Sequence, residues 1–390
     1  MELDPAAWLD RPGVARLLDA LGARGGGSRF VGGAVRDALL GLPGSDLDLA
    51  TVHRPDEVME RLQAARIKAV PTGIAHGTIT AVSSGTVVEV TTLRSDVSTD
   101  GRRATVAFTD EWQDDARRRD FTINALYADP FTGEVIDHVG GEVDIAARRV
   151  RFIGEPLQRI AEDHLRILRF FRFHARFGEG EPDRAGLDAC AARANDLMAL
   201  SRERIADELL KLLALPDPSA TVALMHRHGI FAPILPELRD DAGEAIECLV
   251  EAERQAGIAP DALRRLTAAL PRDPAIATRV AARLKLSNKA KKRLALSAEP
   301  DLCANPRALA YAVGREVAQD RLLLSGEPHA AASISEWAIP SLPISGGELL
   351  ERGVPQGPEV ARTLKAIEER WVAAGFPDGE AFAALVDSAV

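Results

Sequence analysis

Two aspartates one residue apart are the first residues in this chain whose spacing suggests chemistry. Asp46 and Asp48 lie in "SDLDLA", interleaved with Leu47 and Leu49. Because side chains alternate along a strand, the leucines are predicted to face the core and both carboxylates the open face. Two Mg²⁺ ions about 3.5–4 Å apart would relieve the repulsion and clamp the oxygens of a phosphoryl transfer. We predict that Asp46 and Asp48 are catalytic metal ligands.

A third oxygen ligand is usually needed, and "TVVEVTT" offers one. Val88 and Val90 can face inward while Glu89 projects from the opposite face of a neighbouring strand. We therefore add Glu89 to the predicted catalytic residues. The alternative is that Glu89 is an ordinary strand residue facing solvent.

A glycine pair precedes the aspartates in "FVGGAVRDALLG". Val31 is predicted to end a strand, Gly32 and Gly33 to form a turn that a side chain would obstruct, and residues 34–40 to form a short helix. The free N–H groups of that helix would face the turn and suit a triphosphate, with Arg36 adding a charge-assisted contact. A Gly-Gly turn before a helix can also be a matter of topology alone.

The elements that must position these residues change character along the chain. The predicted strands are short apolar segments bounded by glycine, serine or aspartate, namely "SRFVGG", "SDLDLA", "GTITAVSS", "TVVEVTTL" and "EVIDHVG". They should form one sheet. From Pro156 onward, apolar residues recur at three- and four-residue spacing, which predicts an elongated helical array. The predicted fold class is α+β.

Five ordered motifs resemble those of the class II tRNA nucleotidyltransferases, which include the CCA-adding enzymes and bacterial poly(A) polymerases. They are "GGAVRDALLG…SDLDLA", "VEVTTLR", "RRDFTINALYAD", "EDHLRILRFFRF" and "SRERIADELLKLL". The resemblance implies a polymerase-β-like catalytic head with a mixed sheet, then a helical neck, body and tail. The predicted boundaries are 1–155 for the head, 156–215 for the neck, 216–300 for the body and 301–390 for a tRNA-binding tail.

The same resemblance implies a set of nucleotide-binding residues. Arg119 matches a nucleotide-contacting arginine, and Asp120 beside it is expected to help hold the ribose. Asp163 and Arg166 match the base-reading residues, with further arginines following toward the phosphates. The predicted set is Gly32, Gly33, Arg36, Arg119, Asp120, Asp163, Arg166, Arg169 and Arg172.

Base reading by Asp163 and Arg166 also has a chemical reason. Cytosine and adenine present an amino donor beside a ring-nitrogen acceptor, whereas guanine and uracil present a ring N–H donor beside a carbonyl acceptor. A carboxylate beside a guanidinium is complementary to the first pattern only. Residues three apart share one helix face, and Pro156 is well placed to open that helix. The alternative is an ordinary surface ion pair.

The charge distribution bears on the expected partners. A formal net charge of -10 argues against an indiscriminate nucleic-acid binder. The stretch "RLKLSNKAKKR" nevertheless holds six basic residues and no acid. We predict that Lys289, Lys291, Lys292 and Arg293 bind tRNA, the alternative being a solvated helix face.

The expected activity is template-independent addition of CMP and AMP from CTP and ATP to the 3′ end of tRNA, with Mg²⁺ as cofactor. The segment from Arg94 to Asp120 resembles the family's flexible loop, which favours full CCA addition, or A addition alone, over CC addition. An A-adding enzyme or poly(A) polymerase is the nearer alternative. A non-catalytic RNA-binding protein, or a nucleotidyltransferase that modifies protein, is the more distant one.

Two further expectations concern the environment of the chain. The acidic start "MELDPAAWLD" and the lack of an apolar segment near 20 residues long predict a cytoplasmic protein. Cys190, Cys248 and Cys303 are far apart and lack histidines at metal-ligand spacing, which predicts buried free thiols.

Overall fold

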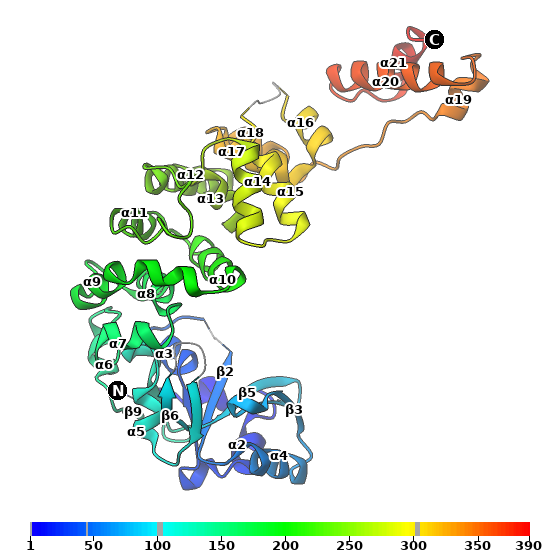
Figure 1. Cartoon of the computed structure of the whole chain (residues 1–390). Coiled ribbons are helices and arrows are strands. Elements are labelled where there is room, and N and C mark those ends of the chain that lie inside the picture. The colour runs from blue at the N-terminus through cyan, green and yellow to red at the C-terminus, as the bar shows by residue number, and fades with distance from the viewer. Residues whose placement is uncertain (1, 44–45, 100–103, 301–304) are drawn as a thin grey trace. The chain divides into compact units, whose positions relative to one another are not determined.

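Strands and helices are segregated along the chain (Figure 1). The computed structural model describes residues 2–43, 46–99, 104–300 and 305–390. Within these residues every strand lies before residue 138, and every regular element from residue 156 onward is a helix. The predicted α+β class is confirmed.

The main sheet has seven strands in the order β3-β4-β5-β2-β1-β8-β9. β2 and β5 are parallel, and each of the other neighbouring pairs is antiparallel, so the sheet is mixed as predicted. Its strands are β1 (Ser28–Val31), β2 (Leu47–Thr51), β3 (Lys68–Gly73), β4 (Thr78–Ser83), β5 (Thr86–Thr92), β8 (Leu126–Ala128) and β9 (Val135–Asp137).

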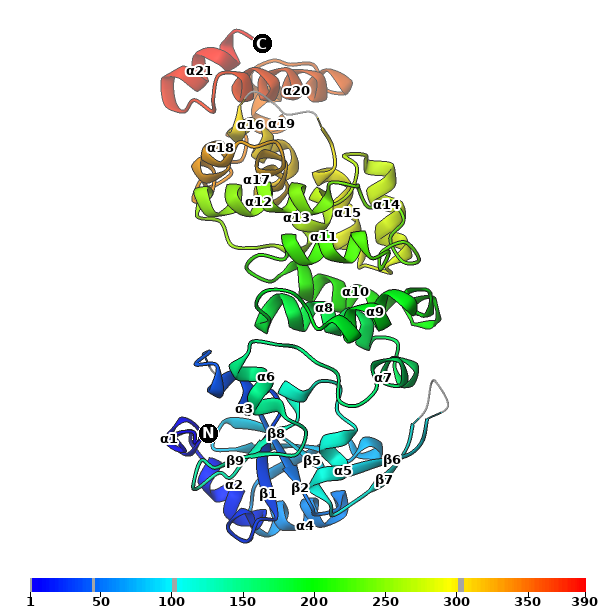
Figure 2. The same ribbon diagram turned by 90° about the vertical axis from the view of Figure 1, so that its left-hand side faces the viewer.

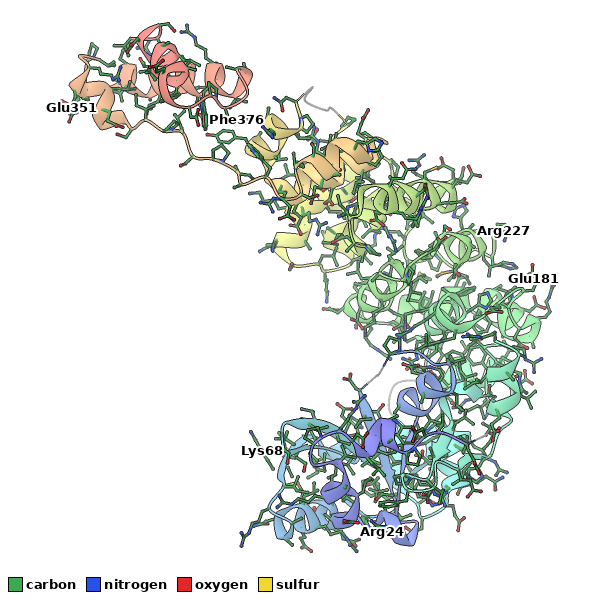
Figure 3. All side chains as sticks on the ribbon, turned by 180° about the vertical axis from the view of Figure 1, so that it is seen from behind. Arg24, Lys68, Glu181, Arg227, Glu351 and Phe376 are labelled. Carbon is green, nitrogen blue, oxygen red and sulfur yellow. The ribbon has the colours of Figure 1, made fainter. Side chains whose placement is uncertain are left out.

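All five predicted strands form, and the structure adds two to this sheet that were not predicted. β3 contains Pro71, and a proline within a segment weakens the sequence signal for a strand. The strand lies at the sheet edge, where the missing N–H of proline is tolerated. Its exposed Lys68 (labelled in Figure 3) also discourages pairing with another chain. β8 has only three residues, too few to show a period.

Alternation along β2 separates the core from the site. Leu47 and Leu49 are buried on one face. On the other face Ala50 is covered by a cluster that includes Ala116 and Tyr127, whereas Asp48 is only half-buried. The open end of this face is therefore where the carboxylates lie.

The segment from Arg94 to Asp120, predicted as a flexible loop, is largely regular where it is described. β6 (Arg94–Thr99) and β7 (Ala104–Phe108) pair antiparallel as a separate two-stranded sheet, followed by α5 (Trp112–Arg117) (Figure 2). Residues 100–103 lie outside the described residues. The β-branched and aromatic residues of "ATVAF" favour a strand. Sequence analysis missed this strand because it treated the whole segment as a loop.

The helices fall into two sets. Those of the first 150 residues are α1 (Ala6–Leu9), α2 (Val14–Ala20), α3 (Gly33–Leu39), α4 (Pro55–Ala64), α5 and α6 (Gly141–Ala146). Those that follow are α7 (Pro156–Glu162), α8 (Arg166–Phe177), α9 (Arg184–Ala192), α10 (Arg202–Leu213), α11 (Ser219–Arg227), α12 (Ala242–Ala256), α13 (Ala262–Ala268), α14 (Pro274–Arg283), α15 (Asn288–Ser297), α16 (Pro306–Val313), α17 (Arg315–Leu324), α18 (Pro328–Ser333), α19 (Gly346–Glu351), α20 (Pro358–Ala373) and α21 (Gly379–Asp387). Short 3₁₀ turns occur at Ala23–Gly25, Ile74–His76, Thr122–Asn124 and Ala194–Ala199.

The chain divides into two compact units. The first comprises Met1–Glu208 and Arg227–Ile234, and the second comprises Leu209–His226 and Leu235–Val390. The first unit therefore holds the sheet together with α7, α8 and α9. The finer division into head, neck, body and tail stays a prediction. No described helix is long and apolar enough to span a membrane.

Aromatic side chains form the core where α8 meets the sheet-bearing part of the first unit. Phe170 and Phe171 are fully buried, and the Phe170 ring stacks on Phe152 with centroids 5.4 Å apart. Phe173 lies 5.2 Å from the Phe121 ring. Such contacts bind α8 to the segment that follows Arg119, so this part of the helical region is built into the first unit.

The cysteine prediction is only partly right. Cys190 is free and buried, whereas Cys248, on α12, is free but exposed. Cys303 lies outside the described residues.

Candidate active site

The structure places two of the three predicted carboxylates side by side. Asp48 of β2 and Glu89 of β5 are register partners in the parallel pair, so their side chains leave the same face of the sheet. Asp46 directly precedes β2 and, like Glu89, is exposed. Among the described residues no three Asp, Glu, His or Cys side chains already converge on one metal-sized point. The carboxylates share a surface rather than a closed cage.

Electrostatics at Asp48 fit a cation site. Burial first, and then the negative charges of Glu89 and Asp46, raise the pKa of Asp48 from its ordinary 3.8 to about 6, against the opposing effect of Arg119 and Arg36. A carboxylate that is costly to ionise beside two others is stabilised by a bound cation. The donor set consists of carboxylate oxygens, which Mg²⁺ prefers.

The glycine turn leads from β1 into α3, as predicted. Gly32 has φ 66° and ψ −123°, a conformation that favours glycine, and its N–H donates to Leu126 O at 3.2 Å. A Cβ added at Gly32 would lie 3.5 Å from Arg119 Nη1, an ordinary contact distance. The backbone angle, rather than the obstruction we predicted, is what calls for glycine. Gly33 is the first residue of α3.

Arg119 lies against this turn, held by a carboxylate that sequence analysis missed. Its Nε and Nη2 donate to Asp115 Oδ2 at 3.2 and 3.0 Å. Burial lowers the pKa of Arg119, but the charges and hydrogen bonds of Asp115 and Tyr127 together outweigh burial, so the net shift is upward and the guanidinium stays charged. Nothing in "DEWQDDARRRD" marks Asp115 among its acidic neighbours except its spacing of four residues from Arg119.

Asp120 and Arg169 are turned toward each other. Arg169 donates through Nε to Asp120 Oδ2 at 2.8 Å, and Asp120 Oδ1 accepts from Asn124 Nδ2 at 3.1 Å. Burial raises the pKa of Asp120, but Arg169 and the hydrogen bonds from Asn124 and the Phe121 backbone together outweigh burial, so the net shift is downward. Each of the two side chains has the other as its partner in this structure. Their contacts with ribose and phosphate stay predictions.

Arg36 and Arg172 are also engaged within the protein. Arg36 is 6% exposed, donates to Asp37 and Asn124, and lies 4.0 Å over the Phe177 ring. Arg172 donates to the buried Glu208 at 2.5 Å. Both arginines thus connect α8 to neighbouring elements in this structure. Their contacts with the phosphates stay predictions.

The predicted helix carrying Asp163 and Arg166 is interrupted. Pro156 does open a helix, but α7 ends at Glu162, Asp163 is extended with φ −150° and ψ 106°, and α8 begins at Arg166. The cause is local: Asp163 Oδ1 accepts from Leu165 N at 3.1 Å, which competes with helical hydrogen bonding. The two residues therefore do not share a helix face.

Asp163 and Arg166 also have separate partners. Both Asp163 oxygens accept from Arg204 Nη2, at 2.8 and 3.1 Å, and Arg166 Nη1 donates to Glu162 at 2.6 Å. The alternative, an ion pair between Asp163 and Arg166, is therefore not formed, and base reading by the two residues stays a prediction. Arg204, which lies in "SRERIADELL" on α10, is a second residue that sequence analysis did not single out.

The predicted tRNA-binding stretch divides into surface and core. Lys289 and Lys292 are exposed and Lys291 is partly exposed on α15. Arg293 is 9% exposed and donates to Asp320 through Nε at 2.8 Å and Nη2 at 2.9 Å, to Asp261 at 3.0 Å and to Glu316 at 2.8 Å. Its guanidinium is occupied inside the second unit, so Arg293 is removed from the predicted RNA-binding set.

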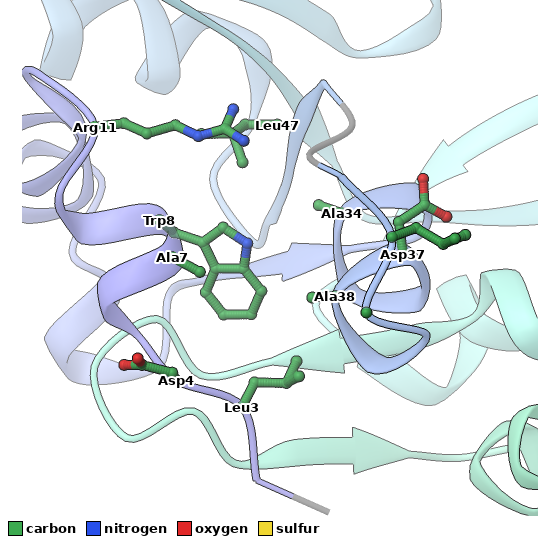
Figure 4. A pocket seen from close by; sticks show the side chains of 11 residues that line it. Leu3, Asp4, Ala7, Trp8, Arg11, Ala34, Asp37, Ala38 and Leu47 are labelled. Carbon is green, nitrogen blue, oxygen red and sulfur yellow. The ribbon is translucent and has the colours of Figure 1, made fainter.

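A pocket in the first unit lies away from the carboxylates (Figure 4). Trp8 lines it from α1, Ala34 and Ala38 from α3, and Leu47 from β2. Leu47 faces the opposite side of β2 from Asp46 and Asp48, so this pocket is behind the candidate site.

Family models match two segments of the chain. Residues 28–151 match the poly(A) polymerase head domain, and residues 183–241 match the probable RNA- and SrmB-binding site of polymerase A. The first segment contains the carboxylates, the glycine turn and Arg119. The second contains Arg204.

Relatives and solved structures extend over most of the chain. It is 35% identical to mouse mitochondrial CCA tRNA nucleotidyltransferase 1, over 89% of this chain and 83% of that protein. It is 31% identical to the CCA-adding enzyme of Lacticaseibacillus paracasei, over 93% and 92%. The Bacillus stearothermophilus CCA-adding enzyme, solved in complex with CTP, superposes with a TM-score of 0.75 at 28% identity, covering 97% of this chain and 98% of that one. With these likenesses added to the sheet, the carboxylates and the motif order, the chain belongs to the CCA tRNA nucleotidyltransferase family.

Proposed function

We propose that this protein adds CMP and AMP, taken from CTP and ATP, to the 3′ end of tRNA and so makes or repairs the CCA terminus. The observation that carries the proposal is the pairing of Asp48 with Glu89 beside the Gly32 turn, in a chain whose relatives are named CCA-adding enzymes. In the reaction the terminal 3′ hydroxyl attacks the α-phosphate of the nucleotide, and pyrophosphate leaves.

Nucleotidyltransferases of this family generally use divalent metal ions. We propose Mg²⁺ here, held by Asp46 and Asp48, with Glu89 as the third candidate ligand. When bound, Mg²⁺ supplies positive charge that lowers the pKa of the attacking hydroxyl and offsets the charge of the leaving group. The protein's contribution is to keep these carboxylates on one open face next to the turn.

The remaining predicted residues have supporting roles in this proposal. Arg119, charged and fixed beside the turn, is positioned to attract the triphosphate. Asp163 and Arg166 would read the base edge. For that, both must exchange their present partners, Arg204 and Glu162, for the nucleotide.

We further propose that the enzyme acts in the cytoplasm. The vertebrate relatives are named as mitochondrial, whereas the bacterial relatives are named simply as CCA-adding enzymes. Fractionation of the source cells, with the protein detected by antibody, tests this part of the proposal. Enrichment in an organelle fraction would contradict it.

The nearer alternative, an A-adding enzyme or poly(A) polymerase, is supported by the name of the matching head-domain family. To separate the two, the protein is incubated with tRNA lacking CCA and with CTP, ATP or both, and the products are sequenced. The proposal expects CC from CTP alone and CCA from both. Products extended only with A, on CC-ending tRNA or as long tails, would contradict it.

A further inference from the structure

Asp115 is a buried carboxylate that the chemistry above does not use. It lies on α5 with its side chain 1% exposed. Burial raises the pKa of Asp115, but Arg119 and Arg118 outweigh burial and hold it well below its usual range. A buried carboxylate that stays ionised keeps strong, directional hydrogen bonds with its donors.

The two oxygens of Asp115 have different neighbours. Oδ2 accepts from Arg119 through Nε and Nη2, at 3.2 and 3.0 Å, and from Tyr127 Oη at 2.7 Å. Oδ1 accepts from Arg118 through Nε and Nη2, at 2.9 and 2.6 Å, and from the backbone N–H of Arg94 at 3.2 Å. Oδ2 thus binds Arg119, whereas Oδ1 binds the backbone N–H of Arg94, the first residue of β6.

The Oδ2 contacts restrict where Arg119 can point. Two N–H groups bound to one oxygen fix the direction of the guanidinium, whose centre also lies 5.7 Å over the Tyr127 ring. The remaining nitrogen, Nη1, faces the Gly32 turn. Arg119 therefore presents a nitrogen to the turn only while Asp115 holds the other two.

We propose that Asp115 is a positioning residue for nucleotide binding: it orients Arg119 at the Gly32 turn and joins that arginine to the start of the β6–β7 hairpin. This inference rests on the proposed function, in which Arg119 binds the triphosphate. Asp115 does not itself touch substrate.

The first test is the Asp115→Asn variant, which keeps the size but replaces the charge and one acceptor. We expect the KM for both CTP and ATP to rise by about 10- to 100-fold, because a charge-assisted contact to the nucleotide is no longer oriented. The Kd for tRNA should stay within about twofold of the unmodified protein. Circular dichroism and thermal melting check that the variant is folded.

Two further variants separate positioning from support of the fold. Arg118→Ala removes the other guanidinium on the same carboxylate, and we expect it to leave nucleotide KM nearly unchanged. In an Arg119→Ala background, Asp115→Asn should add little to the KM already raised, because both changes remove the same contact. Additive effects, or an equal effect from Arg118→Ala, would overturn the inference.

Arg119→Lys tests the idea even where Asp115→Asn does not fold. Lysine keeps the charge but cannot offer two nitrogens to Asp115 and a third to the turn. We expect its KM for CTP and ATP to resemble that of Arg119→Ala. Wild-type KM in Arg119→Lys or Arg119→Ala would overturn the inference, while CCA addition by the unmodified protein would leave the proposed function standing.

Discussion

At the scale of single residues, the proposed chemistry depends most on Asp46 and Asp48. Replacing either by alanine should abolish nucleotide incorporation, because each supplies carboxylate oxygens to the metal. The Kd for tRNA should change little, since neither side chain is proposed to contact the RNA body. Incorporation is measured on tRNA lacking CCA, and binding by gel shift or filter retention.

Asp56→Ala is a matched control for these variants. Asp56 is an exposed carboxylate of the same part of the chain, in the first turn of α4. The Asp56→Ala variant should show unchanged turnover. Near-normal turnover in Asp46→Ala or Asp48→Ala would contradict the metal assignment. Glu89→Ala should lower activity by orders of magnitude only if Glu89 is a direct ligand.

The raised pKa of Asp48 predicts a dependence on pH and Mg²⁺. With the pKa at about 6 in the metal-free protein, protons compete with Mg²⁺ for this carboxylate. At limiting Mg²⁺, activity should fall as pH decreases through about 6, and saturating Mg²⁺ should move the midpoint to lower pH. Rate profiles at two Mg²⁺ concentrations measure this, and coincident midpoints would contradict it.

Lowering the pH is predicted to affect the stability of the folded protein in the opposite direction to its activity. The folded pKa of Asp48 lies above its ordinary 3.8, so between those values the folded state binds more protons than the unfolded state. Asp48 therefore contributes stability to the metal-free protein as pH falls from about 6 toward 3.8, and this contribution is absent at higher pH. Protonation of Asp48 should therefore lower activity near pH 6 without destabilising the folded protein.

At the scale of elements, the break between α7 and α8 governs the proposed reading of the base. Asp163 and Arg166 leave different elements and have different partners, so the nucleotide itself must bring them to one base edge. Asp163→Ala should weaken the interaction with CTP or ATP by about 1–3 kcal/mol, because one hydrogen bond to the base is lost. The variant should also discriminate less against UTP and GTP.

The double variant Asp163→Ala, Arg166→Ala should then be much less than additive, because both side chains act on one base. Competition among all four nucleotides measures selectivity. Arg204→Ala is the matched control: it removes the present partner of Asp163 but no proposed base contact, so selectivity should persist. Slower single variants with unchanged selectivity would show that these residues support the α7–α8 junction and that the base is read elsewhere.

At the scale of the whole molecule, RNA affinity is proposed to depend on the surface lysines of α15. Changing Lys289, Lys291 and Lys292 together to glutamine should weaken tRNA binding and reduce the slope of log affinity against log salt by about 2–3. Nucleotide KM should stay the same. An unchanged salt slope would show that these lysines form only a solvated helix face.

Arg293, adjacent in sequence, should behave differently. Arg293→Gln leaves the fully buried Asp320 with one guanidinium fewer, and removing one partner of a buried ion pair costs about 3–5 kcal/mol. We expect a lower denaturation midpoint for the second unit with no specific change in the salt slope. Lys292→Gln is the control, which should leave the denaturation midpoint unchanged.

Local patterns were sufficient to predict the site's framework. Alternation in "SDLDLA" and "TVVEVTT" placed Asp46, Asp48 and Glu89 on the open face, because strand periodicity depends only on neighbouring residues. The Gly-Gly turn and the helix after it followed from equally local rules. The helical character from Pro156 onward did so too, although the pattern could not show the interruption at Asp163, where one side chain competes with the helix.

Only the tertiary structure decided which charges meet. Asp120 pairs with Arg169 across 49 residues of sequence, Asp163 with Arg204 across 41, and Arg293 with Asp320 across 27. A run of basic or acidic letters does not reveal such partners, because burial and distance are properties of packed elements. For that reason the sequence could not show that Arg293 is buried rather than on the surface. Nor could it show that Asp115, within an acidic stretch, is the residue that binds Arg119.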